Sequence, residues 1–307
     1  MTIKKIKIFS SPKVKKYARE LGADISKIKG TERKGRIIED DVKNFIKDSM
    51  LKKNSFNKRD DKKDITEEFN HKDFGDIEIK DIPRIKRIAA PHLLKAWTEI
   101  PHVTHHDEID ITEMDEFRNS LRDIYTGEKI KTTGLVFIMK ATAKALEYYP
   151  NFNSSLDIEN KKVVFKKYFH IGIAVDTPHG LMVPKIRDVD KKNITTLGKE
   201  LKNISSACRE LKVDKKEFFG GSITISSLGG IGGSFFTPII NYPEVSILGV
   251  GRAETKQIYI NDSFQKRIVL PLSLSYDHRI IDGAEAAKFC NHLKESLGKD
   301  FAYKLAV

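Results

Sequence analysis

Hydrophobic residues recur along residues 84–307 in two alternating patterns, one with a helical period and one typical of strands. Apolar residues at intervals of three and four predict helices over 90–99, 132–148, 195–211 and 282–297. A capping box that begins at Thr112 predicts a further helix to about residue 125, and Pro91 is expected in the first turn of its helix. Short apolar runs predict strands over 102–111, 163–165, 168–175, 181–183, 223–226, 244–251 and 267–276. This mixture predicts an α/β fold, a two-layer α+β sandwich.

The first 48 residues have a purely helical pattern. Ser11 followed by Pro12 is typical of a helix start. The apolar face of this first helix comprises Val14, Tyr17, Ala18 and Leu21, and Gly22 ends it. A second short helix is predicted from about Glu39 to Lys47. We therefore predict a small helical domain over residues 8–48, and its core is so small that binding is the role we expect.

Residues 49–83 separate these two parts. They are rich in Lys, Asp and Asn and have few periodic apolar residues. Such a segment cannot bury enough apolar surface to offset the entropy lost on ordering. We predict a flexible linker over 49–83 and a larger domain over 84–307.

Charge and composition narrow the function classes. The 307 residues carry 55 Lys and Arg against 43 Asp and Glu, a formal net charge of +12, and over half of that excess lies in residues 1–50. This predicts an acidic protein partner or a nucleic acid. No apolar stretch approaches the roughly 18 residues of a spanning helix, so a membrane protein is excluded. The two cysteines, Cys208 and Cys290, exclude a disulfide scaffold and a cysteine-based zinc site, and we expect both to be buried apolar fillers and no metal to be bound.

The residues of the small domain resemble a known binding module. The elements Leu21–Gly22, Asp24, Gly30–Thr31, Gly35–Ile37 and Asp41–Val42 are similar in order and spacing to the peripheral subunit-binding domain of 2-oxo acid dehydrogenase complex acyltransferases. In that family a basic face grips an acidic surface on the dihydrolipoamide dehydrogenase or the decarboxylase component. The resemblance assigns this face to Lys15, Lys16, Arg19 and Arg36. A small nucleic-acid binder is the rival interpretation, which we rank lower because aromatic residues do not interleave with the basic ones.

His278 lies where a predicted strand ends, and Asp282 and Gly283 follow four and five positions later. A histidine at a strand end, with an acid that orders the following turn, is one way to hold a single imidazole tautomer at a cleft. The alternative is that Asp282 caps the next helix and that His278 is an unrelated surface residue.

A second candidate is the glycine-rich segment 220–233, in which a strand ends at Ser226 and Ser227. It lacks the ending of a phosphate-binding loop. Ser226 is either a hydroxyl donor placed to meet developing negative charge, or part of a flexible connection.

These segments together resemble the catalytic domain of the same acyltransferases, a fold shared with chloramphenicol acetyltransferase. The other matching segments are Pro101–Thr104, Phe152–Leu156, Ile171–Pro178, Gly180–Pro184, Phe236–Asn241 and Pro243–Val250. The resemblance implies acyl transfer between a dihydrolipoyl thioester and coenzyme A. It implies His278 as the base, Ser226 as the oxyanion donor and Asp282 as the residue that orders the turn. Ser227, Gly229 and Gly230 are then candidates for the coenzyme A or substrate loop.

The resemblance also implies an assembly. Family members form homotrimers that build a larger cubic or dodecahedral core, with the histidine and the serine contributed by neighbouring subunits. The apolar chain end, residues 301–307, is similar to the tail that holds such trimers together. No Asp-Lys pair has strands of the required kind around it, so we expect the lipoyl group to come from another domain or chain.

The sequence also indicates which acyl group is transferred and in which compartment the protein is located. Residues 105–112 are most similar to the acetyltransferases of pyruvate dehydrogenase complexes, with succinyl or branched-chain transfer as the alternatives. A free-standing coenzyme A-dependent acetyltransferase and a core that only tethers partners are further alternatives. Residues 1–9 carry no secretory signal, so we expect a cytoplasmic protein, or a mitochondrial matrix protein in a eukaryote.

Overall fold

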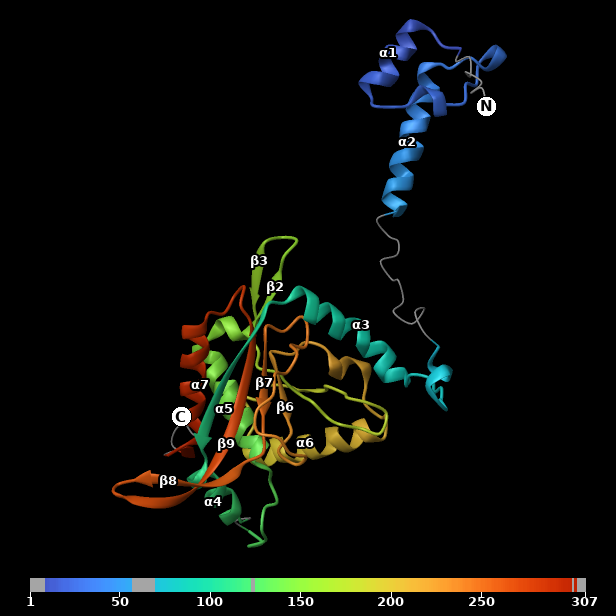
Figure 1. Ribbon diagram of the computed structural model, residues 1–307. Coiled ribbons are helices and arrows are strands. Elements are labelled where there is room, and N and C mark those ends of the chain that lie inside the picture. Colours follow the sequence, from blue (N-terminus) through green and yellow to red (C-terminus); the bar gives the residue numbers. More distant parts are fainter. Residues whose placement is uncertain (1–8, 57–69, 123–124, 300, 303–307) are drawn as a thin grey trace. The chain divides into compact units, whose positions relative to one another are not determined.

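The computed structural model describes residues 9–56, 70–122, 125–299 and 301–302, with no side-chain description for 49–56. The chain divides into two compact units, Met1–Lys80 and Asp81–Val307. The division falls inside the predicted linker 49–83. Each unit is described by itself below, and Figure 1 gives the labels of their elements.

The N-terminal unit is built on two helices. Helix α1 (Pro12–Glu20) starts at Ser11, whose hydroxyl accepts a hydrogen bond from the Val14 amide, as the sequence predicted. Two 3-10 turns, η1 (Ile25–Lys27) and η2 (Arg33–Gly35), connect α1 to α2 (Glu39–Phe56). The small core consists of Val14, Ala18, Ile28, Ile37 and Val42. Helix α2 runs nine residues past its predicted end at Lys47, and the turn η4 (His71–Phe74) also lies within the predicted linker.

One buried carboxylate holds the connection between the two helices. Asp41 is 7% exposed and accepts hydrogen bonds from the Thr31 amide, the Thr31 hydroxyl and the Ile38 amide, at 3.1, 2.7 and 3.0 Å. Gly30 lies at the same place, and a Cβ atom there would come within 2.5 Å of the Arg36 carbonyl carbon. The loop geometry therefore requires both a glycine at 30 and a buried acceptor at 41.

The C-terminal unit contains a seven-stranded mixed sheet. Its order is β1-β9-β7-β6-β4-β5, with β8 also paired to β9. The bounds are β1 His102–Asp110, β4 Ile171–Ile173, β5 Lys185–Ile186, β6 Ile223–Ser227, β7 Ser246–Val250, β8 Glu254–Ile260 and β9 Ser263–Asp277. Strand β6 is parallel to β4 and β7, and β9 is antiparallel to β1, β7 and β8. A separate hairpin pairs β2 (Ser154–Asp157) with β3 (Lys162–Phe165) after the turn η5 (Pro150–Asn153).

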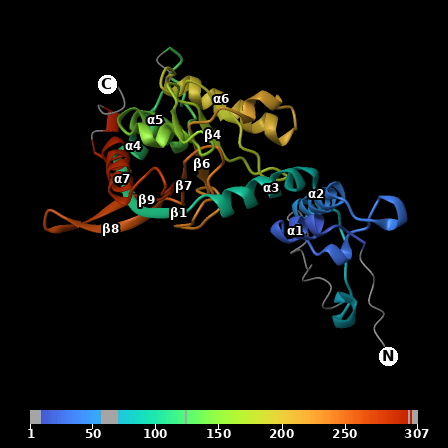
Figure 2. The ribbon, with the colours of Figure 1, turned by 90° about the horizontal axis from the view of Figure 1, so that it is seen from above.

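Helices α5 (Gly134–Tyr148), α6 (Ile194–Arg209) and α7 (Gly283–Leu297) cover one face of this sheet (Figure 2). The main core lies between them, and Leu248 of β7 belongs to it. Because neighbouring residues of a strand point to opposite faces, Ile247 faces the other side, where it packs with Ala96 and Ile100. Helix α3 (Arg84–Glu99) thus packs on the second face of the sheet. The predicted α/β sandwich is confirmed.

Several predicted elements differ from the observed ones. Pro91 lies in the interior of α3, because that helix begins at Arg84 rather than at residue 90. The predicted capping box is wrong: α4 (Thr112–Ser120) is capped by Ile111, and the Thr112 hydroxyl donates to Asp110 while it accepts from the Ile268 amide. The segments 168–175 and 181–183 form only β4 and an isolated bridge between Val175 and Met182.

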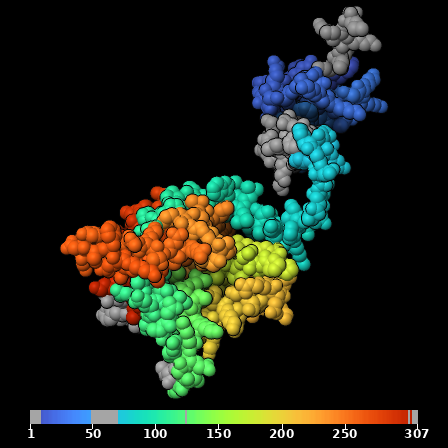
Figure 3. All heavy atoms as spheres, turned by 60° about the horizontal axis from the view of Figure 1, so that its bottom comes forward, coloured from blue at the N-terminus to red at the C-terminus, as the bar shows by residue number. Residues whose placement is uncertain are grey.

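Strand β8 was not predicted, because its residues are exposed or only half-buried and do not form a buried apolar run. With β9 it forms a hairpin that extends from the sheet and makes the orange, left-hand end of the unit in Figure 3. The prediction that Cys208 and Cys290 are buried is confirmed. Residues 303–307 of the predicted trimer-holding tail lie outside the described residues; Phe301, before them, packs into the main core.

Candidate active site

The predicted catalytic histidine is the first residue after β9. Its backbone amide donates to the Pro101 carbonyl at 3.1 Å, and its side chain is exposed. The preceding Asp277 is anchored in the sheet, because its amide donates to the Val245 carbonyl at 2.9 Å. His278 therefore has a fixed backbone and an exposed imidazole whose ring centre lies 5.9 Å from that of Tyr276, which suits a group that exchanges a proton with a substrate.

Asp282 is the N-cap of α7. Its carboxylate accepts a hydrogen bond from the Glu285 amide at 2.7 Å, and its carbonyl accepts one from the Ala286 amide. Among the described residues it makes no hydrogen bond to His278. From the sequence, a role of Asp282 as a helix cap was one of two alternatives, and the structure shows that Asp282 caps α7. Asp282 fixes the point at which the turn after His278 enters a helix.

Ser226 lies near the carboxyl end of β6, and its half-buried hydroxyl has no hydrogen-bond partner among the described residues. Ser227, Gly229 and Gly230 continue directly into a turn, in which the Leu228 carbonyl accepts from the Ile231 and Gly232 amides. Gly229 is packed closely, since a Cβ there would lie 3.4 Å from the Gly251 carbonyl oxygen, whereas Gly230 faces open space. A hydroxyl without a partner, beside an open glycine turn, is available to a ligand.

The structure does not bring Ser226 and His278 together within one chain. Ser226 is in register with Gly249 of β7, whereas Asp277, next to His278, bonds to Val245. Val245 directly precedes β7 and lies about 13 Å from Gly249 along the extended chain, and β6 and β9 flank β7 on opposite sides, each about 4.8 Å away. A general base for the thiol and a donor to the carbonyl oxygen have to act on neighbouring atoms, so this separation does not fit a site in which both side chains come from one chain.

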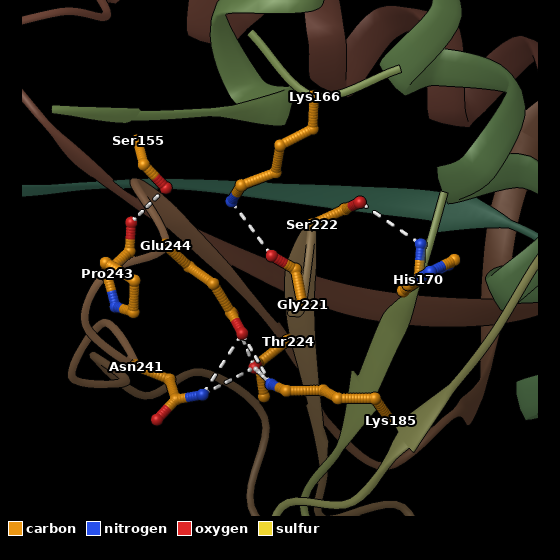
Figure 4. A network of polar contacts seen from close by, with 10 residues as sticks. All are labelled: Ser155, Lys166, His170, Lys185, Gly221, Ser222, Thr224, Asn241, Pro243 and Glu244. Atoms are coloured by element: carbon orange, nitrogen blue, oxygen red, sulfur yellow. Dashed lines mark hydrogen bonds and ion pairs between the residues drawn. The ribbon is translucent and has the colours of Figure 1, made fainter. Parts of the chain in front are cut away.

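A buried polar network lies beneath the turn that leads into β7 (Figure 4). The Lys185 ammonium donates to Glu244 at 2.5 Å and to Thr224 at 3.2 Å, and the Thr224 hydroxyl donates to Glu244 at 2.6 Å. Asn241 donates to the same carboxylate at 3.1 Å. Both charged side chains are almost fully buried, 1% and 2% exposed, and the hydrogen bonds between them compensate for the lost hydration.

Two glycines and a second lysine surround this network. A Cβ at Gly172 or Gly221 would come within about 2.5 Å of its polar atoms, so glycine is required at both positions. The Lys166 ammonium donates to the Gly221 carbonyl at 2.8 Å, and burial lowers the pKa of Lys166 to about 8.

The network connects to the histidine through the backbone. Glu244 directly precedes Val245, whose carbonyl holds the amide of Asp277. Neither Lys185 nor Glu244 was predicted from the sequence as a functional residue. The available signal was an isolated charge beside short apolar runs, as in residues 181–186 and 244–250.

The predicted partner-binding residues all lie on the surface of the N-terminal unit. Lys15, Lys16 and Arg19 are exposed on α1, opposite its buried Val14 and Ala18. Lys16 and Arg36 each lie within 4 Å of one glutamate, in exposed pairs that contribute little stability. This leaves their charge available at the surface.

Within residues 9–56, 70–122, 125–299 and 301–302 no cluster of three His, Cys, Asp or Glu side chains could hold a metal ion. No helix in the same ranges is long and apolar enough to cross a membrane.

Comparison with known proteins was made on this basis. Residues 75–302 match the family described as 2-oxoacid dehydrogenases acyltransferase (catalytic domain), and residues 8–43 match the e3 binding domain. The chain is 44% identical to the dihydrolipoyllysine-residue acetyltransferase component of the pyruvate dehydrogenase complex of Cupriavidus necator, over 94% of this chain and 53% of that protein. The corresponding Haemophilus influenzae protein is 41% identical over 92% of this chain and 52% of its own length. The chain thus spans about half the length of these relatives.

Solved structures agree with these relatives. The cubic core of a pyruvate dehydrogenase multienzyme complex has a TM-score of 0.74 and 42% identity, over 78% of this chain and 98% of that one. The Azotobacter vinelandii dihydrolipoamide acetyltransferase has the same TM-score, 41% identity and the same coverage. The matched family covers well over half of the sequence and the whole sheet with its helices. The chain therefore belongs to the 2-oxoacid dehydrogenase acyltransferase family and carries an e3 binding domain in its N-terminal unit.

Proposed function

We propose that this chain transfers an acetyl group between a dihydrolipoyl group and coenzyme A, as a core component of a pyruvate dehydrogenase complex. The names and identities of its relatives support this activity, and so does the exposed His278 on a fixed backbone. Because those relatives are bacterial, we place the reaction in the cytoplasm.

One observation carries the assignment of the site. In the Azotobacter vinelandii enzyme, a serine, a histidine and an asparagine have been investigated for their role in catalysis; they are separated by 52 and 4 positions. Ser226, His278 and Asp282 are separated by the same 52 and 4 positions. The third residue differs, but an aspartate and an asparagine cap a helix equally well. The difference is therefore compatible with the capping role of Asp282.

In this mechanism the neutral imidazole of His278 removes the proton from the coenzyme A thiol; the reference pKa of a thiol, that of cysteine, is about 8.5, so a base is needed at neutral pH. The thiolate attacks the carbonyl carbon of the acetyl-dihydrolipoyl thioester, and the carbonyl oxygen becomes an oxyanion. The Ser226 hydroxyl donates a hydrogen bond to that oxyanion. When the intermediate collapses, the bond to the lipoyl sulfur breaks and His278 returns the proton to that sulfur. The glycine turn with Ser227, Gly229 and Gly230 is our candidate for the coenzyme A contact.

The separation of Ser226 from His278 supports a site shared between chains. In a cyclic homotrimer each interface is heterologous, so the end of β6 on one subunit can face the end of β9 on the next. A homotrimer is the smallest assembly that fits the family resemblance, and the similarity to a cubic core supports further assembly of trimers. The lipoyl group then enters from another domain or chain.

We further propose that Lys15, Lys16, Arg19 and Arg36 dock dihydrolipoamide dehydrogenase, and the decarboxylase component as the alternative partner. The test is the Kd of the whole chain for purified dihydrolipoamide dehydrogenase at increasing salt. Arg19→Glu should weaken binding at least tenfold, whereas Lys72→Glu, an exposed charge outside this surface, should not. Salt-sensitive binding of duplex DNA, with none to the dehydrogenase, would contradict the proposal.

The activity is tested by acetyl transfer from acetyl-CoA to free dihydrolipoamide, with succinyl-CoA and isobutyryl-CoA as competing donors. The parent should prefer acetyl-CoA, and His278→Ala should lose at least a hundredfold in kcat. An inactive but correctly folded parent would contradict the proposed activity. Equal rates for parent and variant would contradict the role of His278.

A further inference from the structure

We propose that Asp277 and Arg279, the two neighbours of His278, form an ion-paired clasp that positions the histidine and keeps its surroundings electrically neutral. This inference rests on the proposed function, because it concerns the same base. Both are positioning residues and neither is required to touch a substrate.

The clasp is a two-point contact between residues only two positions apart. The Asp277 carboxylate accepts from Arg279 Nε at 2.9 Å and from an Arg279 terminal nitrogen at 2.6 Å. It also accepts from the Arg279 backbone amide at 3.0 Å. The Asp277 side chain is 2% exposed and that of Arg279 is 29% exposed. Parallel hydrogen bonds of this kind fix orientation as well as distance.

Every backbone amide of this turn has an acceptor. The Asp277 and His278 amides donate to Val245 and Pro101, and the Arg279 amide donates to the Asp277 carboxylate. The Ile280 and Ile281 amides both donate to the Asp277 carbonyl, at 3.1 and 3.0 Å. The aspartate thus orders the turn with its carbonyl and its carboxylate, and the peptide units on both sides of His278 cannot rotate. Only the side-chain torsions of the histidine are left free.

The pair also sets the charge next to the imidazole. A buried carboxylate beside His278 would favour the imidazolium form, and an unpaired guanidinium would disfavour it. Because the Asp277 carboxylate and the Arg279 guanidinium form an ion pair, their charges largely cancel near the imidazole. The other charged or titratable groups near this turn include Glu99 of α3, His102 of β1, which is in register with Asp277, Tyr242 of the loop before β7, Tyr276 of β9 and Asp282. The Lys95 ammonium of α3 lies 4.6 Å from the centre of the Tyr242 ring.

These charges predict shifts of opposite sign. Arg279→Gln leaves the Asp277 carboxylate unpaired, which favours the imidazolium form of His278 and moves the rising limb of kcat/KM against pH to higher pH. Asp277→Asn leaves Arg279 unpaired and moves that limb to lower pH. We expect each shift to be about half a pH unit or more, and the double variant to return near the parent midpoint. A residue that only stabilises the fold would leave the midpoint unchanged.

The decisive experiment measures this pH profile on the full-length assembly, with acetyl-CoA and dihydrolipoamide as substrates. Each single variant should lower kcat about 10- to 100-fold with KM for acetyl-CoA within about twofold, since the imidazole is displaced but the coenzyme A loop is untouched. Arg267→Lys is the control for Arg279→Lys, because Arg267 of β9 makes an ion pair with Asp110 of β1 at 2.6 Å, at the other end of β9 from His278. It should keep the parent kcat and midpoint.

If Arg279→Gln fails to fold, Arg279→Lys provides a second variant, in which the positive charge is kept. It should lower kcat without moving the midpoint of the pH profile. Parent-like kcat and midpoint in folded Asp277→Asn and Arg279→Lys would overturn the clasp. So would shifts of the same sign in Asp277→Asn and Arg279→Gln. An inactive parent would instead overturn the proposed function, so the two failures are distinguishable.

Discussion

Ser226 of β6 and His278, the first residue after β9, lie near opposite ends of β7, on opposite sides of that strand. The register of the sheet fixes this distance, because β6 and β9 both pair with β7 through main-chain hydrogen bonds. If both residues act in catalysis, they act from different subunits. The chemistry we propose is thus inseparable from the assembly of the chain.

Removing the proposed oxyanion donor should slow the chemical step without changing substrate binding. We expect Ser226→Ala to lower kcat about 10²- to 10³-fold with nearly unchanged KM, because a hydrogen bond to the oxyanion forms mainly in the transition state. Steady-state kinetics with acetyl-CoA and dihydrolipoamide measure this. Ser263→Ala, on the exposed hairpin, serves as the control and should behave like the parent. A rise in KM with parent kcat would assign Ser226 to substrate binding instead.

The buried pair of Lys185 and Glu244 should matter far more for stability than an exposed pair of the same geometry. Lys185→Met leaves a buried carboxylate without its cation and should lower the free energy of unfolding by about 3–5 kcal/mol. Lys256 and Glu108 also approach to 2.5 Å but are 41% and 42% exposed, so Lys256→Met should cost less than about 1 kcal/mol. Urea unfolding at one protein concentration compares the two variants. Equal losses would show that burial does not set the strength of this pair.

Asp41 should hold the loop of the N-terminal unit. Asp41→Ala removes the acceptor of three hydrogen bonds, and we expect faster hydrogen exchange in residues 28–42 at neutral pH. Asp40→Ala is the matched control, because Asp40 is exposed and its carboxylate makes an exposed ion pair with Lys43 at 3.2 Å. Parent-like exchange in Asp41→Ala would mean that the helices alone order the loop.

The same carboxylate predicts a pH dependence. Burial raises the pKa of Asp41, but the hydrogen bonds from Ile38 and Thr31 outweigh burial and hold this pKa below its ordinary value. A depressed folded-state pKa stabilises the fold above the unfolded value, near 4, and that stability is lost as the pH falls through the folded pKa. Exchange in residues 28–42, corrected for its intrinsic pH dependence, should therefore become faster in the parent as the pH falls below about 4. In Asp41→Ala this pH-dependent change should be absent.

Local signals in the sequence predicted most helices and strands, but not the contacts between residues that are distant in sequence. Ser11–Pro12 predicted the start of α1, because capping depends only on neighbouring residues. Thr112 has the same local signal, but its hydroxyl is used by Asp110 and Ile268, and Ile268 is distant in sequence. A non-local partner thus overrode the local rule. Strand β8 is exposed and is ordered by its pairing with β9, so its hydrophobic pattern is weak.

The candidate site shows the same division. His278 and Asp282 belong to one short motif, and their positions at a strand end and a helix start follow from adjacent residues. Lys185 and Glu244 are 59 positions apart, and only the pairing of β5, β4, β6 and β7 brings them together. The ion pair between Asp277 and Arg279 could not be predicted from the sequence either, because two charged residues on either side of a histidine are common on protein surfaces. The partner of the aspartate depends on its burial, which the sequence pattern did not reveal.

A subunit-mixing experiment tests the central claim most directly, namely that one active site takes His278 from one subunit and Ser226 from its neighbour. His278→Ala and Ser226→Ala chains, each nearly inactive alone, are co-expressed and purified as mixed assemblies. Random mixing should restore about a quarter of the parent acetyl-transfer rate, because about one interface in four then combines an intact histidine with an intact serine. A rate no higher than the average of the two separate variants would contradict a shared site.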